Sequence, residues 1–167
     1  MNRESINTTI LFISLVLLQI IVLNNINFLG YINPFLYILF IFYYPIRKID
    51  YNLIFLSFFL GLSIDYFLNT GGINAAATLF IAYIRIPVLK AVMGKRELDY
   101  SSLTIDKLIF GRKYTYILIL TVIHHFIVFG LEYFKWSSFG IILQKTLLTT
   151  IFTMILVLVS FTFVSKK

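Results

Sequence analysis

The chain alternates long apolar runs with short polar connections, and this pattern predicts membrane-spanning helices. A helix needs about 20 mostly apolar residues to cross the hydrocarbon core of a bilayer. The expected spans cover about residues 8–23, 34–44, 51–68, 75–93, 114–131 and 141–164. The second is short: Asn33 and Pro34 suit a helix start, and Pro45 suits its end. The pattern predicts an all-α membrane protein, a bundle of six transmembrane helices forming a single domain over residues 1–167.

Composition agrees with this assignment. The chain is 60% hydrophobic, 18% aromatic and only 13% charged, with a mean hydropathy of +0.94. A soluble globular domain of this length would carry many more charges. Cysteine is absent, which excludes disulfides, iron–sulfur clusters, thiolate zinc sites and cysteine nucleophiles. Because no nucleophile elbow, HExxH sequence or phosphate loop is present either, we expect no enzyme activity, metal or cofactor.

The basic residues are distributed unevenly between the two predicted sides of the membrane. Basic residues concentrate on the cytoplasmic side of multi-pass proteins. This predicts that both termini and the connection at about 94–113 are cytoplasmic, and it accounts for the net charge of +7 without a nucleic acid. The basic side holds Arg3, Arg47, Lys48, Lys90, Lys95, Arg96, Lys107, Arg112, Lys113, Lys166 and Lys167, against Lys135 and Lys145 on the other.

The connection at 94–113 mixes basic, acidic and apolar residues. It fits either a short amphipathic helix on the membrane surface, ended by Gly111, or an irregular loop. Its basic side chains are candidates for contact with a cytoplasmic partner or with anionic lipid. These candidates are Lys95, Arg96, Lys107, Arg112 and Lys113.

The third and fourth spans each carry one charge within an apolar run, Asp65 and Arg85. A charge at bilayer depth is costly and usually faces a partner inside the bundle. On each helix, small residues lie on the same face as the charge. Two glycines lie in the turn between the helices, and Asn74 suits the cap of the second helix. We therefore interpret Asp65 and Arg85 as a structural ion pair between packed helices; a proton or ligand relay and contact with a partner helix are the alternatives. The predicted packing residues are Ser57, Gly61, Gly71, Gly72, Ala75, Thr78 and Ala82.

Three further polar residues are candidates for the bundle interior: Gln19, His124 and His125. Adjacent positions on a helix point about 100° apart, so the two histidines do not favour a shared metal ion. We expect at least one to form a hydrogen bond across helices, toward Asp65 or a threonine of the sixth span. A role in pH sensing stays open. The threonines of the sixth span are interpreted as a packing face.

The hairpin resembles a known family. Residues Gly61 to Asp65, then Gly71-Gly72-Ile73-Asn74-Ala75-Ala76-Ala77 and Tyr83-Ile84-Arg85, are similar to the characteristic hairpin of MreD, the rod shape-determining membrane protein family of bacteria. One departure is Ile86, which separates Arg85 from Pro87, whereas close relatives have an adjacent Arg-Pro pair. The resemblance implies a multi-pass protein of the bacterial cytoplasmic (inner) membrane.

The resemblance also implies a function in cell shape. MreD-like proteins are non-enzymatic subunits of the elongasome, the peptidoglycan elongation machinery. They bind MreC, a single-span protein, and work indirectly with the MreB filament, the RodA glycosyltransferase and a penicillin-binding transpeptidase. The family is similar in fold to the substrate-capture subunits of energy-coupling-factor transporters, so a ligand-capture subunit of a vitamin-type transporter is the first alternative. An intramembrane enzyme is the second.

Overall fold

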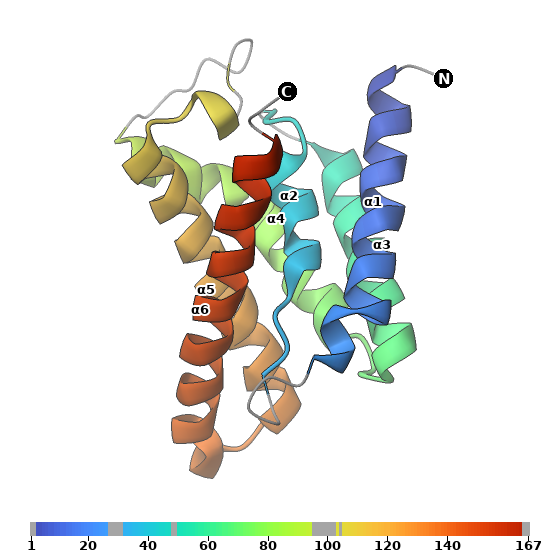
Figure 1. Ribbon diagram of the computed structural model, residues 1–167. Helices are drawn as coiled ribbons and strands as arrows, with labels where there is room; N and C mark the ends of the chain where they lie inside the picture. Colours follow the sequence, from blue (N-terminus) through green and yellow to red (C-terminus); the bar gives the residue numbers. More distant parts are fainter. Residues whose placement is uncertain (1–2, 27–31, 48–49, 95–102, 104, 165–167) are drawn as a thin grey trace.

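Five long helices form the wall of the molecule. The computed structural model describes residues 3–26, 32–47, 50–94, 103 and 105–164. The long helices are α1 (Arg3–Ile21), α3 (Tyr51–Leu68), α4 (Ile73–Met93), α5 (Phe110–Tyr133) and α6 (Phe139–Val164), shown in Figure 1. Each is long and apolar enough to cross a membrane. These five helices indicate a multi-pass membrane protein.

The sixth predicted spanning helix, at residues 34–44, is not among the five helices of the described chain that are long and apolar enough to cross a membrane. Within residues 32–46, which we call the central segment, the chain runs without helical structure up to Phe35. It then forms a 3-10 turn, η2 (Leu36–Ile38), and a helix of five residues, α2 (Leu39–Tyr43). Eleven helical residues would extend only about 16 Å, roughly half the thickness of the hydrocarbon core. The two prolines that bound this stretch limit its helical length.

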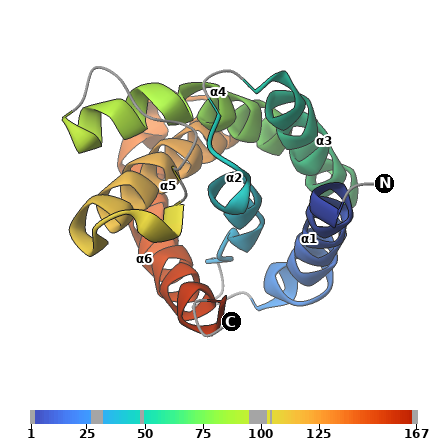
Figure 2. The same cartoon turned by 90° about the horizontal axis from the view of Figure 1, so that it is seen from above.

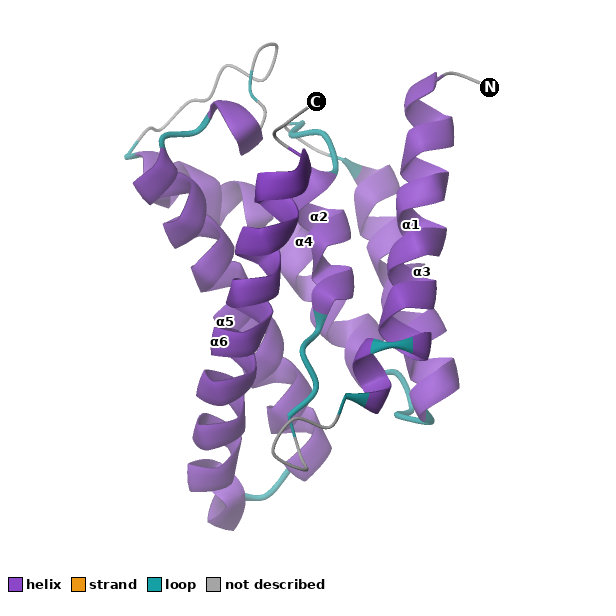
Figure 3. Ribbon diagram, viewed as in Figure 1, coloured by secondary structure: helices purple, strands orange, loops and turns teal. Residues whose placement is uncertain are grey.

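The central segment nevertheless passes through the bundle. Figure 1 shows it running from the end where α1 finishes to the end where α3 begins. Viewed from above, it lies in the middle, with the five long helices around it (Figure 2). The non-helical part leads through η2 into α2 (Figure 3). Because this segment supplies a crossing, α1 begins and α6 ends at the same end of the bundle, as the charge distribution predicted.

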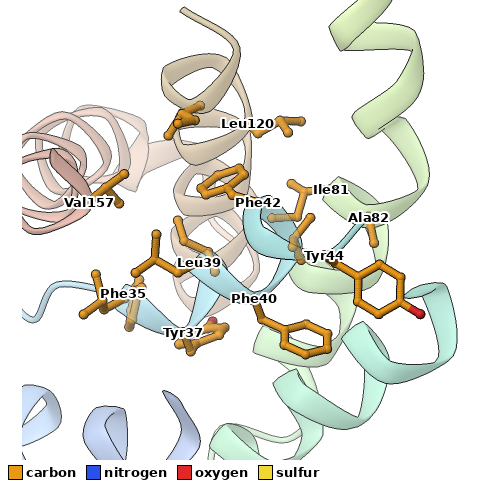
Figure 4. Packing of buried hydrophobic residues seen from close by; sticks show 14 of the residues in the cluster. Phe35, Tyr37, Leu39, Phe40, Phe42, Tyr44, Ile81, Ala82, Leu120 and Val157 are labelled. Atoms are coloured by element: carbon orange, nitrogen blue, oxygen red, sulfur yellow. The ribbon is translucent and has the colours of Figure 1, made fainter. Parts of the chain in front are cut away.

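The hydrophobic core is built around this segment. Ile38, Phe40 and Ile41 are completely buried, and nearly all their neighbours in the segment are buried too. A helix that is apolar on every side is suited to the middle of a bundle, because each face meets another helix. Figure 4 shows its side chains among residues of the surrounding helices, such as Ile81 of α4, Leu120 of α5 and Val157 of α6.

Several predicted boundaries shift. α4 begins at Ile73, two residues before the expected start, and its N-cap is Gly72 in place of Asn74. α5 begins at Phe110, so Gly111 lies within its first turn and ends no surface helix. In the connection before α5 the structure describes a 3-10 turn, η3 (Ile105–Lys107). The rest of the predicted amphipathic stretch, residues 95–102 and 104, lies outside the described residues. Two further 3-10 turns are η1 (Leu23–Asn25) and η4 (Trp136–Ser138).

Candidate functional site

The central segment brings backbone polar groups into the core that no regular helix satisfies. In lipid, an unpaired N–H or C=O has no water to bond, so irregular backbone at membrane depth requires partners within the protein. Each buried group left unpaired costs about 1–3 kcal/mol. The backbone groups that each predicted buried polar side chain contacts therefore show its structural role.

Gln19 of α1 satisfies the start of η2. Its Oε1 accepts hydrogen bonds from the backbone N–H groups of Leu36, at 2.8 Å, and Tyr37, at 3.4 Å. Its Nε2 donates to the carbonyl of Pro34 at 3.0 Å and to Asn24 Oδ1 at 2.9 Å. The first N–H groups of any helical turn lack partners within that turn. One completely buried glutamine thus acts as a cap supplied by a neighbouring helix.

Thr153 of α6 completes this set of contacts. Its Oγ1 accepts a hydrogen bond from the backbone N–H of Phe35 at 3.1 Å. Together Gln19 and Thr153 serve four consecutive residues, 34–37, from opposite walls of the bundle. The threonines of α6 were predicted to form a packing face, and one of them instead holds the central chain in place.

Arg85 of α4 satisfies the other end of the segment. Its guanidinium donates to the carbonyls of Ile41, at 3.0 Å, Tyr44, at 3.3 Å, and Pro45. The carbonyl of Ile41 would normally accept from the N–H four residues later, but that residue is Pro45, which has none. Arg85, only 2% exposed, provides the missing donor. The planar guanidinium, with five N–H groups, can serve three carbonyls at once.

Asp65 of α3 caps the start of α4. Its Oδ1 accepts from the backbone N–H of Asn74 at 3.0 Å and from Asn74 Nδ2 at 2.9 Å, and its Oδ2 accepts from the N–H of Ala75 at 2.8 Å. The hydroxyl of Thr70 also donates to Oδ1. Negative charge at a helix N-terminus is favourable because the N–H groups and the helix dipole point toward it. The carboxylate therefore fixes α3, the turn and α4 together.

The structure does not bring Asp65 and Arg85 together. Both residues are described, and no ion pair or hydrogen bond joins them; each has the separate partners given above. Asp65 lies near the turn between α3 and α4, and Arg85 lies next to the end of α2. The predicted ion pair is therefore not formed, and each residue instead anchors a different part of the backbone. The sequence offered only two opposite charges on adjacent helices and no sign of unpaired carbonyls.

Tyr37 connects the contacts of Asp65 to α5. Its hydroxyl donates to Asn74 Oδ1 at 2.7 Å and lies 3.1 Å from His124 Nε2. A chain of hydrogen bonds therefore runs from Asp65 through Asn74 and Tyr37 to His124. An amide accepts on its oxygen and donates from its nitrogen, two different atoms. Asn74 therefore interrupts any simple proton transfer along this chain, which favours a structural role over the relay alternative.

The two adjacent histidines contact different helices. His125 Nδ1 lies 2.9 Å from Thr150 Oγ1 of α6, which is the predicted type of contact. His124 reaches Asp65 only through Tyr37 and Asn74. Both imidazoles are completely buried, and His124 Nδ1 and His125 Nε2 have no hydrogen-bond partner in the described part of the chain. Within that part, no cluster of three or more histidine and acidic side chains could hold a metal ion.

The predicted small-residue contact between α3 and α4 occurs at Gly61. A Cβ atom added there would lie 2.5 Å from Ala75 Cα and 2.5 Å from the carbonyl oxygen of Asn74. Gly71 and Gly72 form the turn with positive φ angles of 63° and 96°. Ser57, Thr78 and Ala82 are buried as well.

The basic candidates of the connection at 94–113 differ in their positions. Lys107 and Arg112 are exposed, as contact with a partner or lipid requires. Lys113 instead turns inward: its Nζ lies 3.2 Å from Asp106 Oδ1 and 3.7 Å from the ring centre of Phe161. Lys95 and Arg96 lie outside the described residues.

Replacement of Asp65 by asparagine should destabilise the protein. The amide nitrogen of Asn cannot accept a hydrogen bond, so at least one N–H at the start of α4 would lose its partner. We expect Asp65→Asn to lower the free energy of unfolding by about 2 kcal/mol. Detergent-induced unfolding followed by circular dichroism measures this, with the exposed Arg112→Gln as control. An Asp65→Asn variant as stable as the control would contradict the capping role.

Sequence reasoning missed Tyr37 and Thr153 as individual polar anchors. Tyr37 was counted as part of an apolar span, and Thr153 as one of a row of hydroxyls. A signal was present in the spacing of the two prolines, because the helix they allow is too short to cross a membrane. A short crossing requires partners for its backbone, and buried side chains with hydrogen-bonding groups are where such partners are found.

Comparison of the chain with protein-family models, with curated proteins and with solved structures gave no match.

Proposed function

We propose that this chain is a non-enzymatic membrane scaffold of the MreD type, which binds a single-span MreC-like protein in the bacterial cytoplasmic membrane. The resemblance of the α3–α4 hairpin supplies the class of partner. The buried side chains of Gln19, Asp65 and Arg85 support a scaffold role because they hold the protein's own backbone. Such contacts give a rigid bundle whose outer face is available for a partner.

The observation that carries the proposal is the position of Tyr83. It lies at the midpoint of α4, its side chain is 69% exposed, and its hydroxyl has no hydrogen-bond partner among the described residues. Tyrosine is enriched where membrane meets water, since its hydroxyl needs a polar partner. At mid-membrane depth, a polar group on a second transmembrane helix would supply one. Leu79 and Phe80, one turn earlier, are exposed on the same side of α4.

Within the proposed complex, Tyr83 would contact the single transmembrane helix of the MreC-like protein. Exposed Lys107 and Arg112 face the predicted cytoplasmic side, where the MreB-like filament operates. The RodA-like glycosyltransferase and the transpeptidase would join through the MreC-like protein. Regulation of cell shape would follow from holding these partners together.

The proposed contact can be tested by disulfide cross-linking, because the chain has no cysteine of its own. Tyr83→Cys should cross-link to cysteines placed along the transmembrane helix of a co-expressed MreC-like protein, with a maximum at one helical face. Ile151→Cys is a matched control, since Ile151 lies at the midpoint of α6 and is 56% exposed. Equal cross-linking from both positions, or none from Tyr83→Cys, would overturn the proposal.

The two alternatives receive less support. A vitamin-type capture subunit should have a polar pocket at the outer end, whereas the cavity beside α1 and α3 lies at the predicted cytoplasmic end. An intramembrane enzyme requires a histidine close to Asp65 and access for water. His124 and His125 are completely buried, and two side chains lie between His124 and Asp65.

A further inference from the structure

A cavity of about 590 Å³ lies between the start of α1, the end of the central segment and the start of α3. Its volume is in the usual range for ligand pockets. None of its residues takes part in the proposed contact with a partner helix. The lining residues are Ser5, Thr8, Thr9, Phe12, Tyr44, Arg47, Asn52, Phe55 and Leu56.

The polarity of this lining changes with depth in the membrane. α1 and α3 both start at the same end of the bundle (Figure 1). On α1, the hydroxyl residues Ser5, Thr8 and Thr9 come first, and Phe12 lies about 10 Å deeper than Ser5 at 1.5 Å per residue. On α3, polar Asn52 likewise precedes apolar Phe55 by one turn. Both walls are therefore polar at the membrane surface and apolar below it, which is the polarity of a lipid.

Arg47 is the one charged residue among the described residues that line the cavity. Its side chain is 49% exposed. The nearby Asp50 lies 4.0 Å from Arg47 Nε and also caps α3, accepting from the N–H of Leu53 at 3.1 Å. A guanidinium has five N–H donors in a planar fork, so Arg47 can contact Asp50 and still bind a phosphate. The hydroxyl of Thr9 already donates to the carbonyl of Ser5 at 2.9 Å. The hydroxyl of Ser5 and the amide of Asn52 can complete the contacts to phosphate oxygens.

We propose that this cavity binds one anionic phospholipid. Its phosphate contacts Arg47, the hydroxyl of Ser5 and the amide of Asn52, and its acyl chains lie against Phe12, Phe55 and Leu56. The apolar floor distinguishes this ligand from a free phosphate ion, which would gain nothing from it. This inference is independent of the proposed scaffold function. It assigns a structural lipid to the end of the bundle where α1 meets the central segment.

Native mass spectrometry of the full chain in detergent micelles tests the proposal. Dimyristoyl-phosphatidylglycerol and dimyristoyl-phosphatidylcholine have the same acyl chains and differ in charge. We expect the protein to retain one phosphatidylglycerol about five-fold more strongly than phosphatidylcholine, because one basic residue near the surface contributes about 1 kcal/mol. Arg47→Gln should remove this preference, and Arg47→Lys should keep most of it. Arg112→Gln is the matched control, an exposed cation of the same end that does not line the cavity.

The outcomes separate the possible sources of binding. Loss of the preference in Arg47→Gln alone, with circular dichroism unchanged, supports the proposal. Equal loss in Arg112→Gln would mean that diffuse surface charge attracts the lipid, and unchanged retention in Arg47→Gln would exclude the site; either result overturns it. Displacement of phosphatidylglycerol by millimolar inorganic phosphate would assign the cavity to a free anion and would overturn it as well.

Discussion

Replacing Arg85 by methionine is expected to lower the free energy of unfolding by about 3 kcal/mol or more. Methionine is similar in length and apolar, but it leaves the carbonyls of Ile41, Tyr44 and Pro45 without their donor. Each buried unpaired group costs about 1–3 kcal/mol, and partial rearrangement would recover some of that total. Unfolding in mixed micelles with a denaturing detergent, followed by circular dichroism, measures the change.

Two further variants identify the cause of this loss. Arg85→Lys keeps the charge but has one compact ammonium group, which cannot match the fork that reaches three carbonyls, so we expect an intermediate stability. Arg112→Met removes an exposed arginine and should change stability by less than about 0.5 kcal/mol. If Arg85→Met were as stable as Arg112→Met, the carbonyls of the central segment would not depend on Arg85.

The same variants decide whether Asp65 and Arg85 act as a pair. Because their partners are separate, the effects of Asp65→Asn and Arg85→Met should add within about 0.5 kcal/mol in the double variant. An ion pair would give a coupling energy well above that, and exchanging the two charges would restore stability. Restored stability in the exchanged variant would therefore support the ion pair that the sequence predicted.

The sequence predicted the structure best where its apolar runs were long. All five long helices were predicted, four of them within four residues at both ends and α1 within two residues at its C-terminal end, because long apolar runs have few alternatives to a membrane helix. The predicted α3–α4 contact at Gly61 is present, since small residues at spacings of four define one face of a helix. The basic residues also predicted that both termini share one side of the membrane, and α1 begins and α6 ends at the same end of the bundle.

What the sequence did not reveal is the role of the polar residues. Gln19, Arg85 and Thr153 contact backbone atoms of residues 34–45, which are distant in sequence. Every residue has the same backbone groups, so no pattern of side chains shows which carbonyl or N–H lacks a partner. The oppositely charged Asp65 and Arg85 are a visible pattern, and pairing them is the natural expectation. Only the structure shows that Arg85 binds carbonyls at the end of the central segment, whereas Asp65 binds N–H groups at the start of α4.

The second large effect is expected at Gly61, where alanine should lower the free energy of unfolding by about 3 kcal/mol. The added Cβ would lie 2.5 Å from two backbone atoms at the start of α4, Ala75 Cα and the carbonyl oxygen of Asn74. This backbone cannot retreat easily, because Asp65 bonds the N–H groups of the same two residues. α3 and α4 would have to separate, and overpacking of this kind costs about 1–3 kcal/mol or more.

Gly130→Ala and Gly140→Ala are the matched controls for Gly61→Ala, since an added Cβ at either position meets nothing within 4 Å. Both glycines lie in long helices, where alanine is favoured by up to about 1 kcal/mol, so these variants should be neutral or slightly stabilising. Combining Gly61→Ala with Thr78→Ala removes the nearby side-chain contact but leaves the backbone contacts, so recovery should be partial at most. Full recovery would place the obstruction in the Thr78 side chain, and a Gly61→Ala variant as stable as Gly130→Ala would show that α3 and α4 do not require this close approach.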